Sequence, residues 1–234
     1  MANYAIADLC VDIRSRYEHL PRLCRSFLGD PSAKADITVT VSDSDIQKER
    51  IAAEKDFSDG YIESICAYRK LCLQMPKFGG MFLHCSLIRV HDRGIAFLAV
   101  SGTGKTTHTA LWQQLLGDKM TVINGDKPIL RRIDDVFYGY GTPWAGKEGV
   151  YEKDRVAITD LCFLERAEEN ACTPLTPEEG LHKIVHQVIF PEDAAGTEKT
   201  LELLDGLLRK CRLWRIRCNM DLSAAETAYH TICN

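Results

Sequence analysis

The feature that most constrains this 234-residue chain is an apolar run followed by a glycine-containing loop and a helix-forming stretch. The run, residues 94–100 (GIAFLAV), is short and continuously apolar, which predicts a buried strand. The helix is predicted to begin near Lys105 and to end at Gly117, a residue suited to a helix C-terminus. Such a strand–loop–helix unit points several backbone N–H groups, and the positive end of the helix, at one anion.

The loop in this unit matches the Walker A motif with one departure. Lys105 can reach the β- and γ-phosphates of a nucleotide, and the Thr106 hydroxyl can hold Mg²⁺. Ala99 stands where the usual motif has its first glycine. The alternative is a glycine-rich linker with a chance lysine. The predicted strand and helix on either side of the loop make this alternative the less favoured one. We therefore predict a bound nucleoside triphosphate with Mg²⁺, with the nucleotide held by Ser101, Gly102, Thr103, Gly104, Lys105, Thr106 and Thr107.

The composition is that of a soluble globular protein, with 45% hydrophobic and 26% charged residues. A net charge of −4 does not indicate a nucleic-acid-binding surface. No apolar run is long enough to cross a bilayer. The N-terminus has no basic region followed by an apolar block, so no secretory signal is expected. Ten cysteines are scattered without a Cys-x-x-Cys pair. We therefore expect a cytoplasmic protein with reduced thiols rather than disulfides or a zinc site.

The first third of the chain predicts a small N-terminal α/β lobe, residues 1–76, closed by Pro76 and joined through residues 77–80 to the rest. Helices are expected over residues 45–55 and, after a Ser58 cap, over residues 60–75. Two strands are expected from apolar residues that alternate along the chain. These are Ala5, Ala7, Leu9, Val11 and Ile13 in the first strand, and Ile37, Val39 and Val41 in the second.

Residues 77–234 predict a strand-rich P-loop domain. Residues 82–90 and 94–100, with a turn over 91–94, predict an antiparallel hairpin that leads into the loop. Because a hairpin precedes the loop, the sheet is expected to be mixed rather than parallel. The further elements expected are strands over 120–124, 136–142, 157–165 and 213–218, helices over 177–190 and 197–210, and a short terminal helix. The helix over 177–190 would bury Leu181, Ile184, Val185, Val188 and Ile189 on one face.

Two residues are candidates for chemistry beside the loop. Asp126 follows the strand over 120–124, where it could hold Mg²⁺ directly or through water, or accept a proton from an attacking hydroxyl. The alternative is an ordinary turn aspartate, since Asn-Gly-Asp is also good turn chemistry. His84 lies on the first strand of the hairpin. Taken alone, a strand histidine is more often structural.

Residues 137–149 are rich in glycine and aromatics, which suits either a close approach to a ligand or a bend with core aromatics. Trp144 and Lys147 are candidates for substrate contact, Lys147 for an anion, and Glu148 is a candidate for a metal or a hydroxyl. Elsewhere, Arg215 and Arg217 share one strand face, which we interpret as solvated rather than phosphate-binding. His182 and His186 lie beside an apolar stripe, and no glutamate follows His182, so a zinc motif is not expected.

These motifs resemble one branch of P-loop proteins, HPr kinase/phosphorylase and phosphoenolpyruvate carboxykinase. Residues 84–86 (His-Cys-Ser), the hairpin and residues 101–107 look like the carboxykinase pattern. The order of histidine strand, hairpin, loop and a strand ending in Asp126 is equally that of the HPr kinase catalytic domain. The resemblance covers residues 82–127 and fades beyond Pro128. Residues 125–128 and 141–147 are similar to segments of short bacterial HPr-kinase-like proteins.

The resemblance implies an α/β, mixed-sheet P-loop fold of the HPr kinase/phosphoenolpyruvate carboxykinase type. It implies that Lys105 and Thr106 bind phosphate and Mg²⁺, that Asp126 is a metal ligand or base, and that His84 is an active-site or metal-adjacent group. Both families place two acidic residues together after this strand, whereas here Gly125 precedes Asp126 and Lys127 follows it. A second metal ligand would then come from elsewhere, with Glu148 as the candidate, or metal binding is weakened.

We therefore expect an ATP- and Mg²⁺-dependent kinase that transfers a γ-phosphoryl group to a hydroxyl of a peptide, a protein or a small molecule. Two alternatives stay open: a carboxykinase-like decarboxylating enzyme and a nucleotide-binding regulatory protein without transfer activity. The chain is much shorter than a carboxykinase and has no counterpart to that family's oxaloacetate-binding arginine segments. No motif in the sequence identifies the phosphoryl acceptor, distinguishes ATP from GTP, or indicates a homo-oligomer. Neither nucleic acid nor a membrane is an expected partner.

Overall fold

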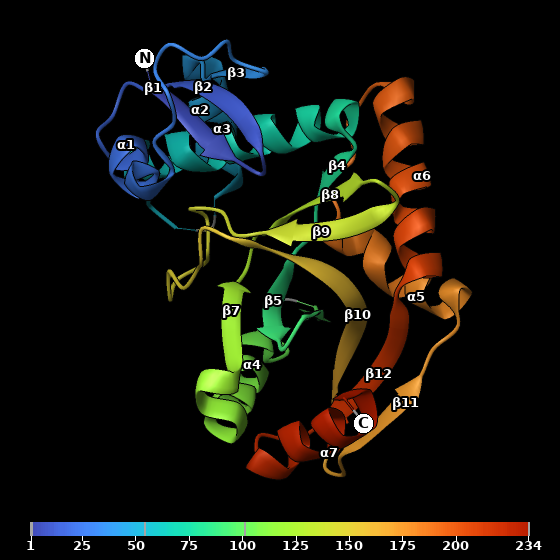
Figure 1. Ribbon diagram of the computed structural model, residues 1–234. Helices are drawn as coiled ribbons and strands as arrows, with labels where there is room; N and C mark the ends of the chain where they lie inside the picture. Colours follow the sequence, from blue (N-terminus) through green and yellow to red (C-terminus); the bar gives the residue numbers. More distant parts are fainter. Residues whose placement is uncertain (1, 54, 101, 234) are drawn as a thin grey trace.

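The structure is a computed structural model that describes residues 2–53, 55–100 and 102–233. It is a mixed α/β fold with two sheets (Figure 1). The strands are β1 (Ala2–Ile6), β2 (Leu9–Arg14), β3 (Ile37–Thr40), β4 (Gly80–Phe82), β5 (Cys85–Val90), β6 (Arg93–Leu98), β7 (Met120–Asn124), β8 (Ile129–Ile133), β9 (Val136–Tyr140), β10 (Arg155–Arg166), β11 (Ala171–Pro174) and β12 (Arg212–Cys218). The α-helices are α1 (His19–Leu23), α2 (Asp43–Ala52), α3 (Asp59–Gln74), α4 (Lys105–Leu116), α5 (Pro177–Ile184), α6 (Ala194–Lys210) and α7 (Leu222–Cys233).

The N-terminal part forms a three-stranded sheet in the order β1-β2-β3, with β1 and β2 antiparallel and β2 and β3 parallel. The prediction of one continuous strand through residues 5–13 was wrong. Ala7 and Asp8 both have positive φ, so the chain turns back there and forms a hairpin. The turn changes the expected burial before it but not after it. Ala5 is exposed, whereas Leu9, Val11 and Ile13 are buried as expected.

The two expected helices of this part are present, and a side-chain cap marks the start of each. Ser58 accepts a hydrogen bond from the Tyr61 N–H at the start of α3, as its sequence position indicated. Ser42 and Asp45 form a reciprocal capping box at the start of α2. After α3 the chain passes through a 3₁₀ turn, Met75–Phe78, and Gly79 in the left-handed conformation, and then enters β4. The division of the chain into domains at residue 76 stays a prediction.

The larger sheet has nine strands, in the order β4-β8-β9-β10-β6-β5-β7 with β12 and β11 branching from β10. The mixed pairing that the sequence predicted is confirmed, because β6 is antiparallel to β5 and parallel to β10. β10 joins the sheet together: its first residues, 155–157, pair with β9, and its later residues pair with β6 on one side and β12 on the other. The sheet curls along this strand (Figure 1).

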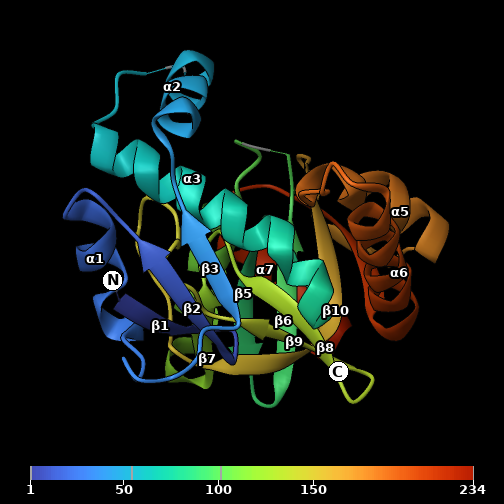
Figure 2. The same cartoon turned by 90° about the horizontal axis from the view of Figure 1, so that it is seen from above.

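Alternating side chains of β6 enter two separate cores. Ile95 and Phe97 pack with Trp112 of α4 and Ala228 of α7, which cover one face of the sheet. Leu98 faces the opposite core, which contains the apolar residues of α5 and α6. Figure 2 shows α3 running across the molecule toward α5 and α6, and the turn after α3 contacts α6.

The helix predicted over residues 177–190 is shorter than expected. α5 ends at Ile184 and a 3₁₀ turn, Val185–Gln187, follows it. The Gln187 carbonyl accepts a hydrogen bond from the His84 backbone N–H at 2.8 Å, which takes the chain out of the helix and against the sheet. Ile184 is buried as predicted, but Leu181 is 42% exposed.

All ten cysteines are free thiols, and burial raises the pKa of Cys24, Cys72 and Cys211 to about 12. Within the described part of the chain, none of the helices has both the length and the apolar character required for a membrane span.

Asp160, at the centre of β10, is fully buried and holds four groups together. Its carboxylate accepts hydrogen bonds from Arg93 at 2.8 Å, Arg212 at 2.9 Å and the indole N–H of Trp214 at 2.8 Å, and from the adjacent Thr159 hydroxyl. These contacts tie β6, β10 and β12 together. A buried carboxylate is tolerated when it is paired and hydrogen-bonded in this way.

We expect Asp160→Ala to lower the free energy of unfolding by about 3 kcal/mol, because it leaves two arginines without their partner. Urea unfolding followed by circular dichroism measures this. The matched control is Asp205→Ala, which breaks an exposed i,i+4 pair with Arg209 and should cost less than about 0.5 kcal/mol. Equal losses in the two variants would show that the Asp160 cluster is not a special support of the sheet.

Candidate functional site

The glycine loop, residues 99–104, connects β6 to α4, which begins at Lys105 as the sequence predicted. Gly102 and Gly104 have φ of 80° and 121°, a backbone conformation that L side chains rarely adopt. Gly104 is the N-cap of α4 and, among the described residues, no side-chain hydrogen bond caps this end of the helix. Ser101 lies outside the described residues.

Arg166, the last residue of β10, holds the outer side of this loop. Its guanidinium donates to the carbonyl oxygen of Thr103 at 3.2 Å and to the carbonyl oxygen of Gly102.

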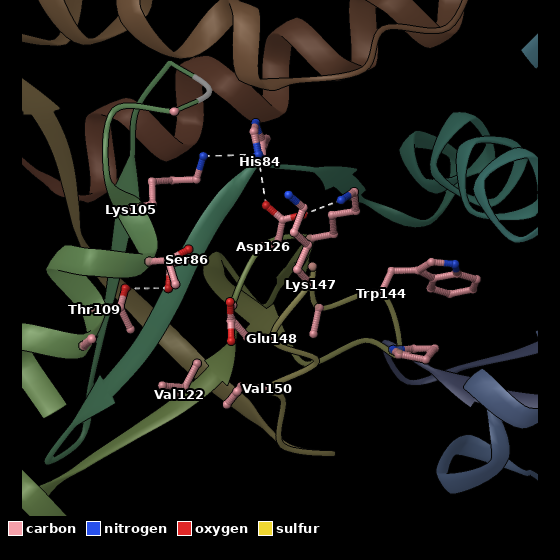
Figure 3. A pocket seen from close by; sticks show the side chains of 18 of the residues that line it. His84, Ser86, Lys105, Thr109, Val122, Asp126, Trp144, Lys147, Glu148 and Val150 are labelled. Atoms are coloured by element: carbon pink, nitrogen blue, oxygen red, sulfur yellow. Dashed lines mark hydrogen bonds and ion pairs between the residues drawn. The ribbon is translucent and has the colours of Figure 1, made fainter. Parts of the chain in front are cut away.

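Lys105, His84 and Asp126 lie together next to this loop (Figure 3). The Lys105 Nζ lies 3.1 Å from His84 Nε2, which in turn lies 3.0 Å from Asp126 Oδ1. His84 precedes β5 and Asp126 follows β7, so three elements supply the cluster. The structure therefore brings together the three residues for which we predict catalytic roles, and those roles stay predictions.

Asp126 lies in a local turn and is also part of the cluster with His84 and Lys105. Asn124 Oδ1 accepts hydrogen bonds from the N–H groups of Asp126, at 2.9 Å, and of Lys127, at 2.7 Å. The Asn124 amide in turn donates to Thr142. This is local turn chemistry, and its effect is to fix the direction of the Asp126 carboxylate.

The charges around Asp126 keep it ionised. Burial alone would raise the pKa of Asp126, but the hydrogen bond from His84 and the ion pair with Lys127 outweigh burial and hold the pKa well below its usual range. Lys105 shows the opposite balance: its burial lowers the pKa of the ammonium, and Asp126 only partly restores it. The site thus pairs a firmly anionic carboxylate with a half-buried lysine.

A cavity of about 1120 Å³ surrounds this cluster. The glycine loop forms part of its wall, with Gly102, Thr103, Gly104 and Thr106, while Thr107 is exposed but does not line it. Its charged lining consists of Lys105, Lys127, Lys147, Asp126 and Glu148. With three ammonium groups against two carboxylates, the cavity favours an anionic ligand.

The segment over residues 143–150 forms the opposite wall. Gly146 approaches Asp126 so closely that a Cβ there would lie 2.9 Å from the Asp126 Cβ. The turn that follows carries Lys147 and Glu148, both exposed and both lining the cavity. Both candidates therefore line the same cavity as Asp126 (Figure 3).

Trp144 has features of both interpretations of residues 137–149, a ligand contact and a core aromatic. It lines the cavity, but it is only 7% exposed and its indole N–H donates to the Ser64 carbonyl at 3.1 Å. Its ring packs on Tyr68, with centroids 4.6 Å apart. Trp144 thus offers one edge to a ligand, while the rest of its side chain belongs to the core between the N-terminal part and the larger sheet.

The arginine pair and the two helical histidines do not line the cavity. Arg215 pairs with Glu179 at 3.1 Å and contacts Glu165, so its charge is neutralised locally. These ion pairs agree with the expectation that Arg215 lies on a solvated strand face rather than in a phosphate site.

Sequence reasoning did not single out the N-terminal wall of the cavity, where His19, Leu23, Tyr61 and Ile65 lie. It also did not single out the Ser86–Thr109 hydrogen bond of 2.8 Å on the cavity floor. Both depend on contacts between segments far apart in the chain, and no local motif marks them.

The residues that the structure describes include no group of three or more histidine, cysteine, aspartate or glutamate side chains arranged to hold a metal. Mg²⁺ does not require such a cage, because it keeps several waters and uses one or two carboxylates together with substrate phosphates. Asp126 and the Thr106 hydroxyl, both lining the cavity, are oxygen donors of the kind Mg²⁺ takes. The donor set therefore fits a nucleotide-associated Mg²⁺, with Glu148 within the same lining.

Comparison with known proteins adds little to this geometry. No family model and no curated protein matches the chain. Among solved structures, an HPr(Ser) kinase/phosphatase from Coxiella burnetii is similar at 12% sequence identity and a TM-score of 0.31, over 55% of this chain and 88% of that one. A similarity of this size carries no argument about what the chain binds or catalyses.

We expect Arg166→Leu to loosen the glycine loop, because the variant removes two charge-assisted hydrogen bonds to its carbonyls. Amide hydrogen exchange in a peptide spanning residues 102–108 should become about tenfold faster, the equivalent of about 1.4 kcal/mol. Arg217→Leu, an exposed arginine on β12, is the control and should leave this exchange unchanged. An unchanged rate in Arg166→Leu would mean that the loop holds its shape without Arg166.

Proposed function

We propose that this chain is an ATP- and Mg²⁺-dependent kinase that transfers the γ-phosphoryl group to a hydroxyl, with a P-loop fold of the HPr kinase type. One observation carries the proposal: Lys105, at the start of a helix that no described side chain caps, contacts His84, which in turn contacts Asp126, inside one cavity. Phosphoryl transfer needs positioning and charge neutralisation more than covalent chemistry. These residues provide both.

Each residue has a distinct task in this proposal. The loop backbone and Lys105 bind the β- and γ-phosphates. Asp126 and Thr106 hold the metal, which neutralises charge on the phosphates. The proton of the attacking hydroxyl passes to the Asp126 carboxylate or to solvent. The acceptor oxygen bonds to the γ-phosphorus as the bond to the bridging oxygen breaks and ADP leaves.

His84 orients the other two groups. Its Nε2 lies within hydrogen-bond distance of both Lys105 and Asp126, so when a phosphate takes the lysine, the ring is left to the carboxylate. Glu148 supplies a second carboxylate to the cavity, in a chain that has Gly125 where the resembled families have the first residue of an acidic pair. Within the described part of the chain no arginine lines the cavity, so the decarboxylating alternative has no support there.

A regulatory nucleotide-binding protein without transfer activity is the second candidate. The observation in its favour is the ion pair between Lys127 and Asp126 Oδ2, which occupies the carboxylate that would hold the metal. Such a protein would bind the nucleotide with little dependence on Mg²⁺ and would not release ADP in the presence of any acceptor.

We expect Lys105→Ala to abolish thermal stabilisation by ATP, because it removes the cation that reaches the phosphates. Wild-type protein should gain about 2.7 kcal/mol at a ligand concentration one hundred times the dissociation constant. The matched control is Lys119→Ala, an exposed lysine just beyond the far end of α4, which should keep the full shift in melting temperature. A wild-type shift in Lys105→Ala would contradict phosphate binding at this loop.

We expect Asp126→Asn to separate binding from transfer. The amide keeps the shape of the carboxylate but loses the charge that holds Mg²⁺. Metal-free ATP should bind nearly as before, while Mg²⁺-dependent ADP release should fall by a factor on the order of 10²–10⁴. Asp118→Asn, an exposed aspartate beyond the C-terminus of α4, is the control. Transfer within a few-fold of wild type would move the metal role to Glu148.

A further inference from the structure

Two lysine side chains belong to the cluster around Asp126, and only one of them comes from the glycine loop and its helix. Lys105 contacts His84 Nε2, which contacts Asp126 Oδ1 (Figure 3). Lys127, the residue after Asp126, forms an ion pair directly with Oδ2. Both lysines line the cavity. The two carboxylate oxygens of Asp126 are therefore engaged by different groups, one by the His84 ring and the other by the Lys127 ammonium.

The backbone of Lys127 is fixed by three segments of the chain. Its N–H donates to Asn124 Oδ1 at 2.7 Å, and its carbonyl accepts from the Tyr68 hydroxyl at 2.7 Å and the Thr142 hydroxyl at 2.8 Å. Burial raises the pKa of Tyr68 well above its ordinary value, so the phenol stays protonated and can donate. Because the backbone is held, the ammonium moves only by rotation of its own side chain and stays near Asp126.

The cluster carries more positive than negative charge. Lys105 and Lys127 share one carboxylate, Asp126, and Glu148, which also lines the cavity, is exposed. Burial lowers the pKa of Lys105, and repulsion by the Lys127 charge adds to this effect. An ammonium has three donors, so Lys127 can keep its contact with Asp126 and donate to another acceptor as well. The cluster is therefore suited to one further anionic oxygen beside Asp126.

The contact between Lys127 and Asp126 is not needed to hold the turn together. The two side chains are 39% and 22% exposed, and a partly exposed ion pair contributes little to stability. The hydrogen bond from the Asp126 N–H to Asn124 Oδ1 already fixes the direction of the carboxylate. The Lys127 ammonium is therefore available to a ligand without loss of the turn.

A bound triphosphate would need more than one cation in this cavity. Phosphoryl transfer depends on neutralising the charge of the transferred group. Asp126 and Thr106 suit one Mg²⁺, and the described residues include no group of three or more side chains arranged to hold a metal. Further positive charge beside Asp126 would then come from the protein, and Lys127 is already in contact with that carboxylate.

We infer that the Lys127 ammonium binds a γ-phosphate oxygen of the nucleotide beside Asp126 and supplies there the charge that a second metal ion would otherwise bring. The ammonium stabilises charge and takes part in no covalent bond. Because ADP has no γ-phosphate, this contact favours ATP over ADP. The inference rests on the proposed function and adds to it a residue that distinguishes substrate from product nucleotide.

The first test compares binding of ADP with binding of a non-hydrolysable ATP analogue, by titration calorimetry in EDTA so that no metal contributes. In Lys127→Met the dissociation constant of the analogue should rise about tenfold or more, the size expected for a hydrogen bond between charged groups, while that of ADP changes at most a few-fold. Lys127→Arg keeps the charge and should retain the preference for the analogue. Lys77→Met, an exposed lysine outside the cavity lining, is the control and should change neither affinity.

The second test measures transfer with Mg²⁺-ATP. ADP release by Lys127→Met should fall by a factor on the order of 10², the typical loss for one preorganised group that stabilises transition-state charge. Lys127→Asp replaces the cation by a possible metal ligand. We expect free Mg²⁺, beyond the amount that saturates ATP, to activate Lys127→Asp but not the wild-type protein. Lys127→Gln serves in both tests if Lys127→Met does not fold.

Four results would overturn the inference while leaving nucleotide binding intact. Equal losses of affinity for the analogue and ADP in Lys127→Met would mean that Lys127 only maintains the shape of the site. Unchanged affinities would mean that it does not touch the phosphates, and faster transfer would make it a competitor of the metal. Activation of the wild-type protein by free Mg²⁺ would assign the charge to a second ion. Failure of the wild-type protein to bind either nucleotide is a different result, because it would remove the proposed function itself.

Discussion

The structure around the cavity depends on one shared atom, Nε2 of His84. It lies within hydrogen-bond distance of a lysine, which only donates, and of a carboxylate, which only accepts when ionised. One ring nitrogen cannot satisfy both partners at the same moment, so the cluster is incomplete by itself. A phosphate oxygen beside Lys105 would complete it. The proposed function therefore rests on the presence of these three residues and equally on the hydrogen bond that His84 cannot make to both partners at once.

Strand pairing explains why these residues meet. β5 pairs with β6 on one side and β7 on the other, both antiparallel, with Cys85 opposite Leu98 and Leu87 opposite Asn124. The start of β5 therefore lies beside the ends of both neighbours. His84, the glycine loop and Asp126 all emerge at this one edge of the sheet. The Asn124 turn and the close approach of Gly146 then fix Asp126 in place.

The sequence predicted best what is decided locally. The hairpin, α4, α6 and β12 follow from continuous apolar runs, periodicity and caps, and each is present within a few residues of its expected bounds. Where two local signals conflicted, the prediction failed: alternation through residues 5–13 hid a turn at Ala7 and Asp8, and the apolar stripe after Ile184 continued past the helix end. The short strands β4, β8 and β11 were missed because tertiary pairing, not composition, makes them strands. The cluster of His84, Lys105 and Asp126 was accessible through motif order, whereas the N-terminal wall of the cavity arises from packing between distant segments and could not be predicted from any one of them.

The most direct measurement of the central claim is a crystal structure with a non-hydrolysable ATP analogue and Mg²⁺. We expect the β-phosphate against the backbone of residues 102–106, the Lys105 ammonium moved from His84 to a phosphate oxygen, and the γ-phosphate beside Asp126. A nucleotide bound elsewhere, or one whose phosphates leave the Lys105–His84 contact intact, would contradict it.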